Sequence, residues 1–368
     1  MNFFNKNGII PYINAHDTYT IYGGSRMAEN TLETMKEVAA SFVDLKQMQI
    51  VLGKKLAELT GNEAAYFTNG AAGALLLCAC VSMAEDNEYY YRMLPQVKGT
   101  KREIIVMRAQ RNAYDAALAV SGADIIEIGD ADETLEMELN GSINEKTAAI
   151  AYFASTLYQR GSMEFEKVME IAKKHNVPVI VDAAAQLPPK DNLQKYTNAG
   201  ADMVIFSGGK TLCGPQDSGV ILGKKVWIER CIRFGAPEHG ICRVSKTSRE
   251  AMAGLYTAIE NYVNQDEKER DQELRLLLHI ISEKLKEVDV EMEKQIVEGG
   301  PVGQTYPRLF LYLPGRIKVD EIVCKMKERR IYIGIDVFQN AIYISPLNLN
   351  EEEAQIVAKE LVNILAEY

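Results

Sequence analysis

The sequence predicts a doubly wound α/β domain followed by a smaller α+β domain. The middle of the chain alternates short apolar segments with amphipathic helical segments, a pattern typical of a mainly parallel sheet covered on both faces. This pattern changes after about residue 250, where a long charged helical stretch begins. The length of 368 residues fits two domains at roughly 150 residues each.

The expected elements follow in chain order. A loop-like arm ends near Ser25, and a helical stretch covers residues 32–59. Strands are expected at residues 104–107, 124–128, 148–153, 177–183, 201–206 and 219–222, with helices between them at 70–84, 114–121, 164–175 and 193–199.

The C-terminal part is expected to begin with a helical stretch over residues 250–288. Strands at 308–313, 331–335 and 341–345 then alternate with helices at 319–330 and 351–367. We therefore expect an N-terminal arm and helix (1–50), a large α/β domain (51–255) and a small α+β domain (256–368).

Composition excludes several classes of protein. The formal charge of −10 argues against a nucleic-acid partner, because the overall field repels phosphate. Residues 64–84 carry no charge, but their apolar part is too short to span a bilayer, so no membrane segment is expected. The six cysteines lack a CxxC pair, which favours reduced thiols in the cytoplasm. The four histidines form no known metal motif, so no metal is expected.

A small-residue segment, Gly70-Ala71-Ala72-Gly73, begins the first expected helix of the large domain. Small residues at a helix N-terminus let backbone amides approach a phosphate, and the helix dipole favours its charge. Taken alone, the segment is better explained by close helix packing.

Polar residues follow three expected strands. Asp182 ends one strand, and Lys210 follows the next after Ser207-Gly208-Gly209. The segment from Arg108 to Asn112 comes after an earlier strand. Taken individually, Asp182 could be a helix cap, Lys210 a solvated lysine, and the segment from Arg108 to Asn112 a polar loop. In an open α/β sheet, however, ligands bind at the carboxyl ends of the strands, where all of them gather.

Together these features match the needs of pyridoxal phosphate. Its aldehyde forms a Schiff base with a lysine, its phosphate lies on a helix N-terminus, and its pyridine nitrogen pairs with a carboxylate. We therefore predict a pyridoxal phosphate enzyme.

The chain resembles fold-type I pyridoxal phosphate enzymes, in the branch that contains selenocysteine synthase and D-glucosaminate-6-phosphate ammonia-lyase. The resemblance rests most strongly on Phe206-Ser207-Gly208-Gly209-Lys210, Gly214-Pro215-Gln216 and Ser218-Gly219. It extends to Phe42-Val43-Asp44-Leu45 with Gln49, Leu59-Thr60-Gly61-Asn62, Arg111-Asn112-Ala113-Tyr114-Asp115 and Val181-Asp182-Ala183-Ala184-Ala185-Gln186.

This resemblance implies a role for each matching residue. Lys210 would be the Schiff-base lysine and proton carrier, and Asp182 would pair with the pyridine nitrogen. Gly70, Ala71 and Ala72 would offer amides to the phosphate, and Ser207 its hydroxyl. Gln110, where related lyases have histidine, or its neighbour Arg111 would lie against the ring. Lys246 is also expected to contact the cofactor. Together with Arg243 it would close on a phosphate or carboxylate, which both residues would reach from a neighbouring subunit.

A substrate carboxylate favours a bidentate arginine. Arg308, at the start of a C-terminal strand, is the first candidate and Arg26 the second; a surface position at the strand end explains Arg308 equally well. The arm that carries His16, Tyr19 and Tyr22 would cover the active site or clasp a second subunit. The resemblance implies a homodimer, or a multiple of it, with shared sites.

The favoured reaction is a β-elimination that releases ammonia and a keto acid from a small anionic amino acid or amino sugar acid. Selenium transfer to seryl-tRNA is the second possibility. The same residues would also serve an aminotransferase, aldolase or racemase. Cys213, three residues after Lys210, suggests a desulfurase, and a regulatory protein that binds the cofactor is the non-enzyme alternative.

Overall fold

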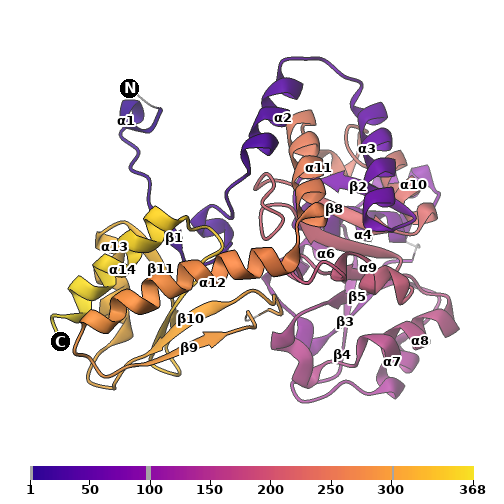
Figure 1. Cartoon of the computed structure of the whole chain (residues 1–368). Coiled ribbons are helices and arrows are strands. Elements are labelled where there is room, and N and C mark those ends of the chain that lie inside the picture. The colour runs from indigo at the N-terminus through magenta and orange to yellow at the C-terminus, as the bar shows by residue number, and fades with distance from the viewer. Residues whose placement is uncertain (1–2, 97–100, 301) are drawn as a thin grey trace. The chain divides into compact units, whose positions relative to one another are not determined.

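The computed structural model describes residues 3–96, 101–300 and 302–368, which form two compact units. The large unit comprises Met27–Asn264 and residues 302–303; the small unit comprises the described residues up to Arg26 with Gln265–Gly300 and Gln304–Tyr368. Figure 1 shows the course of the chain through both. The domain boundaries expected from the sequence lie at residues 50 and 255, and the units divide after Arg26 and Asn264.

The large unit is built on a seven-stranded sheet with the order β2-β8-β7-β6-β5-β3-β4. The strands from β7 to β4 run parallel, whereas β8 is antiparallel to both of its neighbours. The strands are β2 (Ala64–Thr68), β3 (Glu103–Met107), β4 (Asp124–Ile128), β5 (Thr147–Phe153), β6 (Val179–Asp182), β7 (Met203–Ser207) and β8 (Gly219–Gly223).

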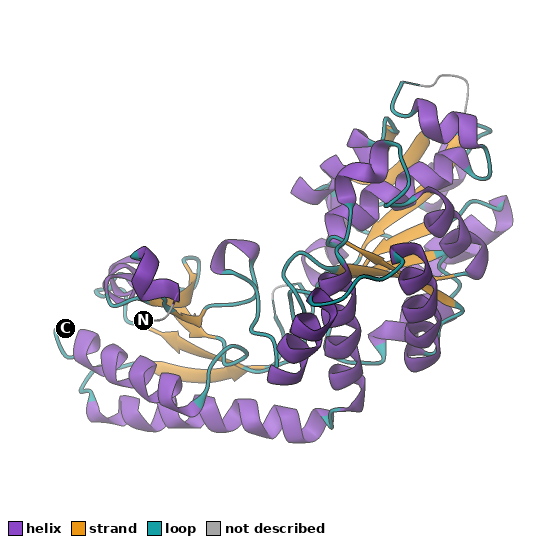
Figure 2. Cartoon of the chain, turned by 90° about the horizontal axis from the view of Figure 1, so that it is seen from above, coloured by secondary structure: helices purple, strands orange, loops and turns teal. Residues whose placement is uncertain are grey.

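Helices cover both faces of this sheet (Figure 2). They are α2 (Glu29–Ala39), α3 (Leu45–Thr60), α4 (Ala71–Ala84), α5 (Glu88–Met93), α6 (Ala116–Val120), α7 (Glu136–Ser142), α8 (Phe165–His175), α9 (Asn192–Asn198), α10 (Lys225–Phe234) and α11 (Arg249–Asn264). Successive strand residues enter two separate cores: Ile104 and Val106 pack with α4, whereas Ile105 and Met107 pack with α3 and α8. Burial on both faces explains why these strands are apolar without a break.

The small unit contains a five-stranded mixed sheet with the order β1-β11-β12-β10-β9. Its strands are β1 (Ile13–Ala15), β9 (Glu293–Val297), β10 (Arg308–Tyr312), β11 (Ile331–Asp336) and β12 (Ala341–Ile344), and its helices are α1 (Phe3–Asn7), α12 (Glu267–Lys284), α13 (Val319–Glu328) and α14 (Glu351–Leu365). Helices α12, α13 and α14 share one apolar core with the sheet. The predicted fold class, a large mainly parallel α/β sheet with a smaller α+β unit, is confirmed.

Three local expectations were wrong. The arm before Ser25 contains strand β1, which pairs in parallel with β11. The stretch 32–59 is two helices, because Asp44 caps α3 by accepting a hydrogen bond from the N–H of Gln47 (2.9 Å). The stretch 250–288 is likewise divided, because Asp266 accepts hydrogen bonds from the N–H groups of Lys268 and Glu269 and so begins a new helix, α12. Such side-chain caps stop one helix and start another.

No helix among the described residues is both long enough and apolar enough to cross a membrane.

A cluster of three buried polar residues, Asp17, Tyr306 and Arg308, attaches the N-terminal arm to the rest of the small unit. Arg308 and Asp17 are 1% and 4% exposed, and Arg308 Nη2 lies 2.9 Å from Asp17 Oδ2. The Tyr306 hydroxyl donates to Asp17 Oδ1 (2.5 Å), and its ring lies 3.9 Å from the Arg308 guanidinium carbon. The arm is therefore attached to the C-terminal sheet by a charged pair as well as by β1.

Replacing Asp17 by Ala should destabilise the small unit by about 3–5 kcal/mol, because it leaves the Arg308 charge buried without a partner. Denaturant unfolding followed by circular dichroism measures this loss, while fluorescence of the single tryptophan, Trp227, follows the large unit. Arg26→Ala is the matched control: it breaks the more exposed ion pair with Glu353 and should cost less than about 1 kcal/mol. Equal losses in the two variants would contradict the role given to Asp17.

Candidate active site

The candidate active site lies at one edge of the large sheet. Strands β2 and β7 are both antiparallel to β8, so they point the same way, and β6, β5 and β3 are parallel to β7. Their carboxyl ends therefore meet at one edge. Gly219, the first residue of β8, is paired with Thr68 on one side and with Ser207 on the other. This register places the ends of β2 and β7 on either side of Gly219.

Helix α4 begins at this edge with exposed backbone donors. Its first residue is Ala71, and Gly70 before it has φ of 114° and no capping side chain. The first N–H groups of a helix have no partner within the helix, so those of Ala71 and Ala72 are available to an anion. A Cβ on Gly219 would lie 2.7 Å from the Gly70 carbonyl carbon and 3.0 Å from the Ala71 nitrogen. The glycine therefore allows β8 to pass directly behind this turn.

Lys210 stands on a tightly bonded loop between β7 and β8. The Gly208 N–H donates to the Ser218 carbonyl and the Gly214 N–H to the Gly208 carbonyl, both at 2.8 Å. A Cβ on Gly209 would lie 2.4 Å from Gln216 Oε1. The two glycines before Lys210 are thus needed for close packing, and they fix the backbone of a half-buried lysine.

Asp182 ends β6, the neighbour of β7 in the sheet. Burial raises the pKa of its carboxyl group; a hydrogen bond from the Ala184 N–H (3.0 Å) and the charge of Lys210 oppose this rise. A carboxylate that is desolvated in this way gains most from a cationic partner placed beside it.

Gln110 ends the 3₁₀ helix η2 (Arg108–Gln110) after β3 and is buried. Its Oε1 accepts a hydrogen bond from the N–H of Phe153 (2.9 Å), the last residue of β5. The side chain of Gln110 is therefore held at the same edge of the sheet as Asp182.

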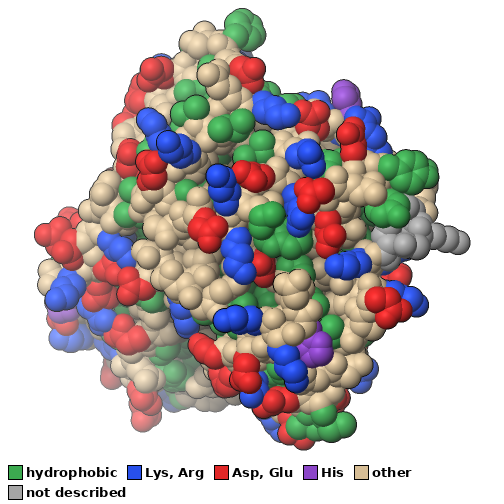
Figure 3. All heavy atoms as spheres, turned by 90° about the vertical axis from the view of Figure 1, so that its right-hand side faces the viewer, with side chains coloured by type: hydrophobic (Ala, Val, Ile, Leu, Met, Phe, Trp, Pro, Cys, Tyr) green, Lys and Arg blue, Asp and Glu red, His purple; other side chains and the backbone are tan. Residues whose placement is uncertain are grey.

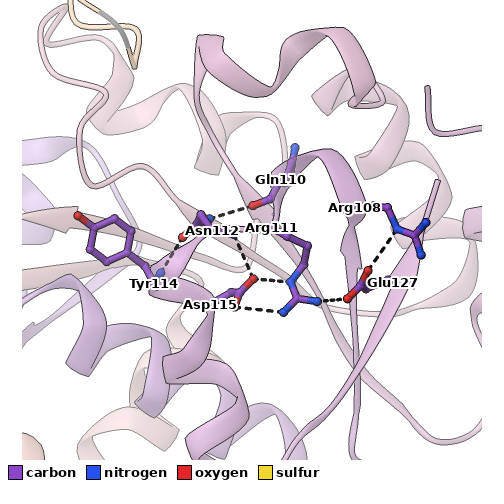
Figure 4. A network of polar contacts seen from close by, with 7 residues as sticks. All are labelled: Arg108, Gln110, Arg111, Asn112, Tyr114, Asp115 and Glu127. Carbon is purple, nitrogen blue, oxygen red and sulfur yellow. Dashed lines mark hydrogen bonds and ion pairs between the residues drawn. The ribbon is translucent and has the colours of Figure 1, made fainter. Parts of the chain in front are cut away.

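The neighbouring Arg111 is engaged elsewhere (Figure 4). Its guanidinium group forms ion pairs with Asp115 and with Glu127 on β4, and Glu127 also pairs with Arg108. Asn112 donates to the Gln110 carbonyl at 2.9 Å. This network braces the loop that carries Gln110, and of the two residues predicted to contact the ring it leaves Gln110 as the better placed.

Arg243 and Lys246 lie in and directly after the 3₁₀ helix η5 (Ile241–Ser245), and both are exposed. They line a cavity of about 150 Å³ together with Gln49 of α3. The loop passes close to the start of α4, since a Cβ on Gly73 would lie 3.3 Å from the Ser245 Cβ.

The remaining predicted residues belong to the small unit. Arg308 is paired with Asp17, but its buried Nε has no hydrogen-bond partner among the described residues. Arg26 pairs with Glu353 at 2.5 Å. Tyr22 packs its ring against His16 with 4.4 Å between centroids. Their predicted contact with substrate stays a prediction.

Cys213 is half-buried, and its Sγ lies 3.5 Å from the Thr211 carbonyl oxygen. Gly219 and Gln49 lie in segments that carry the family resemblance, but sequence reasoning assigned neither of them a role. The structure supplies the missing information: Gly219 is paired with both Thr68 and Ser207, and the side chain of Gln49 is buried.

Known proteins resemble this chain in sequence and in fold. Residues 26–299 match the family model SelA, described as L-seryl-tRNA selenium transferase. The chain is 31% identical to a D-glucosaminate-6-phosphate ammonia lyase of Salmonella typhimurium, over 71% of this chain and 70% of that protein. It is 24% identical to an L-seryl-tRNA(Sec) selenium transferase of Alkaliphilus oremlandii, over 99% of this chain and 84% of that protein.

A solved structure of a D-glucosaminate-6-phosphate ammonia-lyase superimposes with a TM-score of 0.87 at 25% identity, covering 100% of this chain and 99% of that one. The match extends to both units. The family match and the likeness of fold lead to one conclusion: this chain belongs to the SelA family of fold-type I pyridoxal-phosphate-dependent enzymes.

Proposed function

We propose that this chain is a pyridoxal-phosphate-dependent lyase that releases ammonia from a phosphorylated amino sugar acid. The observation that carries the proposal is the meeting of Lys210, Asp182 and the uncapped start of α4 at one edge of the sheet. The substrate class follows from the ammonia lyase that the chain resembles at 31% identity in sequence and over its whole length in structure.

The residues at this edge fit the cofactor. The N–H groups of Ala71 and Ala72, next to a glycine cradle that a Cβ would fill, suit a phosphate. Ser207 adds a hydroxyl at the end of β7, where it is paired with Gly219. Asp182, a carboxylate whose pKa burial raises, suits a protonated ring nitrogen. When bound, pyridoxal phosphate supplies an aldehyde for covalent attachment and a ring that accepts electrons from the α-carbon.

Lys210 has two roles in this proposal. Its Nζ would hold the cofactor and, once released, would take the α-proton of the substrate and return it later. Asp182 would keep the ring nitrogen protonated, which makes removal of the substrate α-proton easier. Gln110, whose Oε1 accepts a hydrogen bond from the Phe153 N–H, would limit movement of the ring. In the overall reaction the β-hydroxyl group leaves as one water, and a second water replaces the amine nitrogen. The two waters cancel, so the substrate loses one ammonia in total.

Selenium transfer to seryl-tRNA is the second candidate, favoured by the family model and by the relative that matches 99% of the chain. A net charge of −10 opposes it, because a tRNA must be drawn in against that field. We also propose that the active form is a homodimer or a multiple of it.

The first test is the visible absorbance of the protein after addition of pyridoxal phosphate, together with ammonia release from D-glucosaminate 6-phosphate. Lys210→Ala should remove the band of the bound cofactor and lower the rate by at least about a hundredfold, since the variant loses its proton carrier. Lys195→Ala, which changes an exposed lysine on α9, should leave both unchanged. A wild-type protein that acquires no visible band would overturn the cofactor assignment, whereas a band without ammonia release from any amino sugar acid would overturn the lyase.

Asp182→Asn should have opposite effects on the two forms of the protein. Because burial raises the pKa of Asp182, the folded cofactor-free protein holds this proton more tightly than the unfolded chain. The wild type therefore loses stability as pH rises from the ordinary pKa of an aspartate through the raised one. The asparagine variant lacks this dependence and keeps an oxygen for the Ala184 N–H.

With cofactor, the same variant should bind pyridoxal phosphate about tenfold more weakly or worse, equivalent to about 1.4 kcal/mol or more. Unfolding of the cofactor-free protein across pH and titration with cofactor measure the two effects. If Asp182→Asn destabilised the cofactor-free protein and left cofactor affinity intact, Asp182 would be a structural residue only.

Gly219→Ala should weaken the binding of pyridoxal phosphate about tenfold, or by about 1.4 kcal/mol, because the new Cβ displaces the turn at Gly70 and Ala71. The binding of pyridoxal, which has no phosphate, should change little. Equilibrium titration with both compounds separates the phosphate cradle from the rest of the site. The matched control is Gly141→Ala, whose Cβ meets no atom within 4 Å; equal weakening for both compounds would argue against the cradle.

A further inference from the structure

We propose that Cys80 and Cys242 form a redox-active thiol pair, which hydrogen peroxide converts into a disulfide and a thiol reductant restores. Cys80 lies in α4 and Cys242 in the 3₁₀ helix η5, both in the large unit. The modification would attach the short segment around η5 covalently to α4. This inference goes beyond the proposed function, because no step of that reaction uses either thiol.

Four of the six cysteines lie together in the core of the large unit. Cys78, Cys80, Cys231 and Cys242 all belong to the apolar cluster that packs α4 against the sheet, and each is 1% exposed or less. A buried thiol usually behaves as a small apolar side chain, so burial alone assigns no chemistry. The contacts between the thiols decide which of them can react together.

Cys80 and Cys242 are the pair whose thiols contact one another. The Cys80 thiol donates a hydrogen bond to the Cys242 sulfur, whereas Cys78 and Cys231 interact electrostatically with the neighbouring thiols. A disulfide needs a sulfur–sulfur distance of about 2 Å and two Cβ atoms roughly 4 Å apart. Two thiols that already share a hydrogen bond can reach this geometry by a small movement of the η5 segment.

Tyr91 of α5 places a hydroxyl group beside the same sulfur. Its buried ring stacks on Phe234 with 4.5 Å between centroids. The hydroxyl donates to the Phe234 carbonyl (2.5 Å) and also lies within hydrogen-bonding distance of Cys242. A Cβ on Gly240 would lie 2.4 Å from Tyr91 Cε1, so this glycine lets the backbone before Cys242 pass close to the ring. Tyr91 thus holds Cys242 on the side that faces Cys80.

The two thiols differ in how easily each loses its proton. The hydrogen bond from Cys80 lowers the pKa of Cys242; burial opposes this change and the Tyr91 hydroxyl adds to it. Burial raises the pKa of Cys80 well above its usual range. Because the thiolate is the form that attacks an oxidant, Cys242 is the thiol that reacts first and Cys80 the one that completes the disulfide.

The chemistry proceeds in two balanced steps. The Cys242 sulfur attacks hydrogen peroxide, an S–O bond forms, the O–O bond breaks, and the departing hydroxide takes the Cys242 proton as the first water. This leaves a sulfenic acid on Cys242. The Cys80 sulfur then attacks the Cys242 sulfur, the S–O bond breaks, and the second hydroxide leaves with the Cys80 proton as water. The two sulfurs lose two electrons in total, and these reduce one peroxide to two waters.

The η5 segment gives the oxidant a route to the buried pair. Helix η5 is only five residues long, its first cap has no side-chain hydrogen bond, and Val244 within it is 78% exposed. A short exposed segment of this kind opens locally at less cost than a buried helix such as α4. Opening of η5 exposes Cys242 to a small uncharged oxidant, while Cys80 keeps its place on α4. A disulfide would then restrain the segment that carries Arg243 and precedes Lys246.

The experiment is treatment of the full chain with hydrogen peroxide, followed by blocking of free thiols and mass spectrometry of peptides prepared without reductant. The wild type should yield one peptide pair joined through Cys80 and Cys242, and dithiothreitol should separate it. Cys231→Ala changes a thiol of the same core that lies outside the pair, and this variant should form the disulfide as the wild type does.

The order of the two steps is tested with dimedone, which traps sulfenic acids. In Cys80→Ala the sulfenic acid on Cys242 has no partner thiol, so dimedone should label Cys242. In Cys242→Ala it should leave Cys80 unlabelled. Should either alanine prevent folding, the peptide map of the wild type still decides whether the pair exists.

The attachment of η5 is tested by amide hydrogen exchange. In the oxidised protein, residues 240–246 should exchange about tenfold more slowly or less, because the crosslink suppresses the local opening. The 3₁₀ helix η4 (Thr156–Gly161), which contains no cysteine, is the internal control and should exchange equally in both forms.

The proposal is overturned if peroxide leaves Cys80 and Cys242 unjoined, or if it joins Cys242 to Cys78 or Cys231 instead. It is also overturned if dimedone labels Cys80 rather than Cys242, or if the disulfide forms and η5 exchanges as before. None of these results bears on the lyase, whose tests use the cofactor band and ammonia release.

Discussion

The register of β2, β8 and β7 is the constraint on which the candidate active site depends. Gly219 is paired with both Thr68 and Ser207, so the start of α4 and the loop that carries Lys210 are held on either side of one residue. Because that residue has no Cβ, the turn at Gly70 can lie against β8. A shift of one residue in this register would separate the start of α4 from the loop that carries Lys210 and would turn the side chains of β8 to the opposite face.

The charges at this edge are placed where the fold cannot neutralise them fully. Asp182 is held by one backbone N–H and by the charge of Lys210, and burial still raises its pKa. The first amides of α4 have no capping side chain. An unsatisfied acid and unsatisfied donors cost stability in the empty protein, and a ligand with a cation at one end and an anion at the other offsets both costs. The site is therefore preorganised for such a ligand before it binds.

The fold class could be predicted because it depends on local pattern: apolar segments that are buried on both faces predict the strands. The same pattern places Asp182 at the end of one strand and Lys210 three residues after another, and their roles at the site stay a prediction. Strand β1 could not be predicted, because a three-residue strand gains its stability from β11, more than 300 residues away in sequence. Gln49 could be marked by the resemblance but could not be given a role, for a related reason: a glutamine in a helix becomes informative only when packing buries its amide.

Small anions and large polyanions face different fields on this protein. At long range the net charge of −10 dominates, and on the face drawn in Figure 3 basic and acidic side chains are interspersed rather than gathered into a basic patch. Salt screens that field beyond about 8–10 Å, so close to the protein surface the local donors determine which anion is held. The first amides of α4 have no capping side chain, and Arg243 and Lys246 are exposed. Such local donors favour a small anion over a nucleic acid, whose charges extend over its whole surface and meet the net negative charge of the chain.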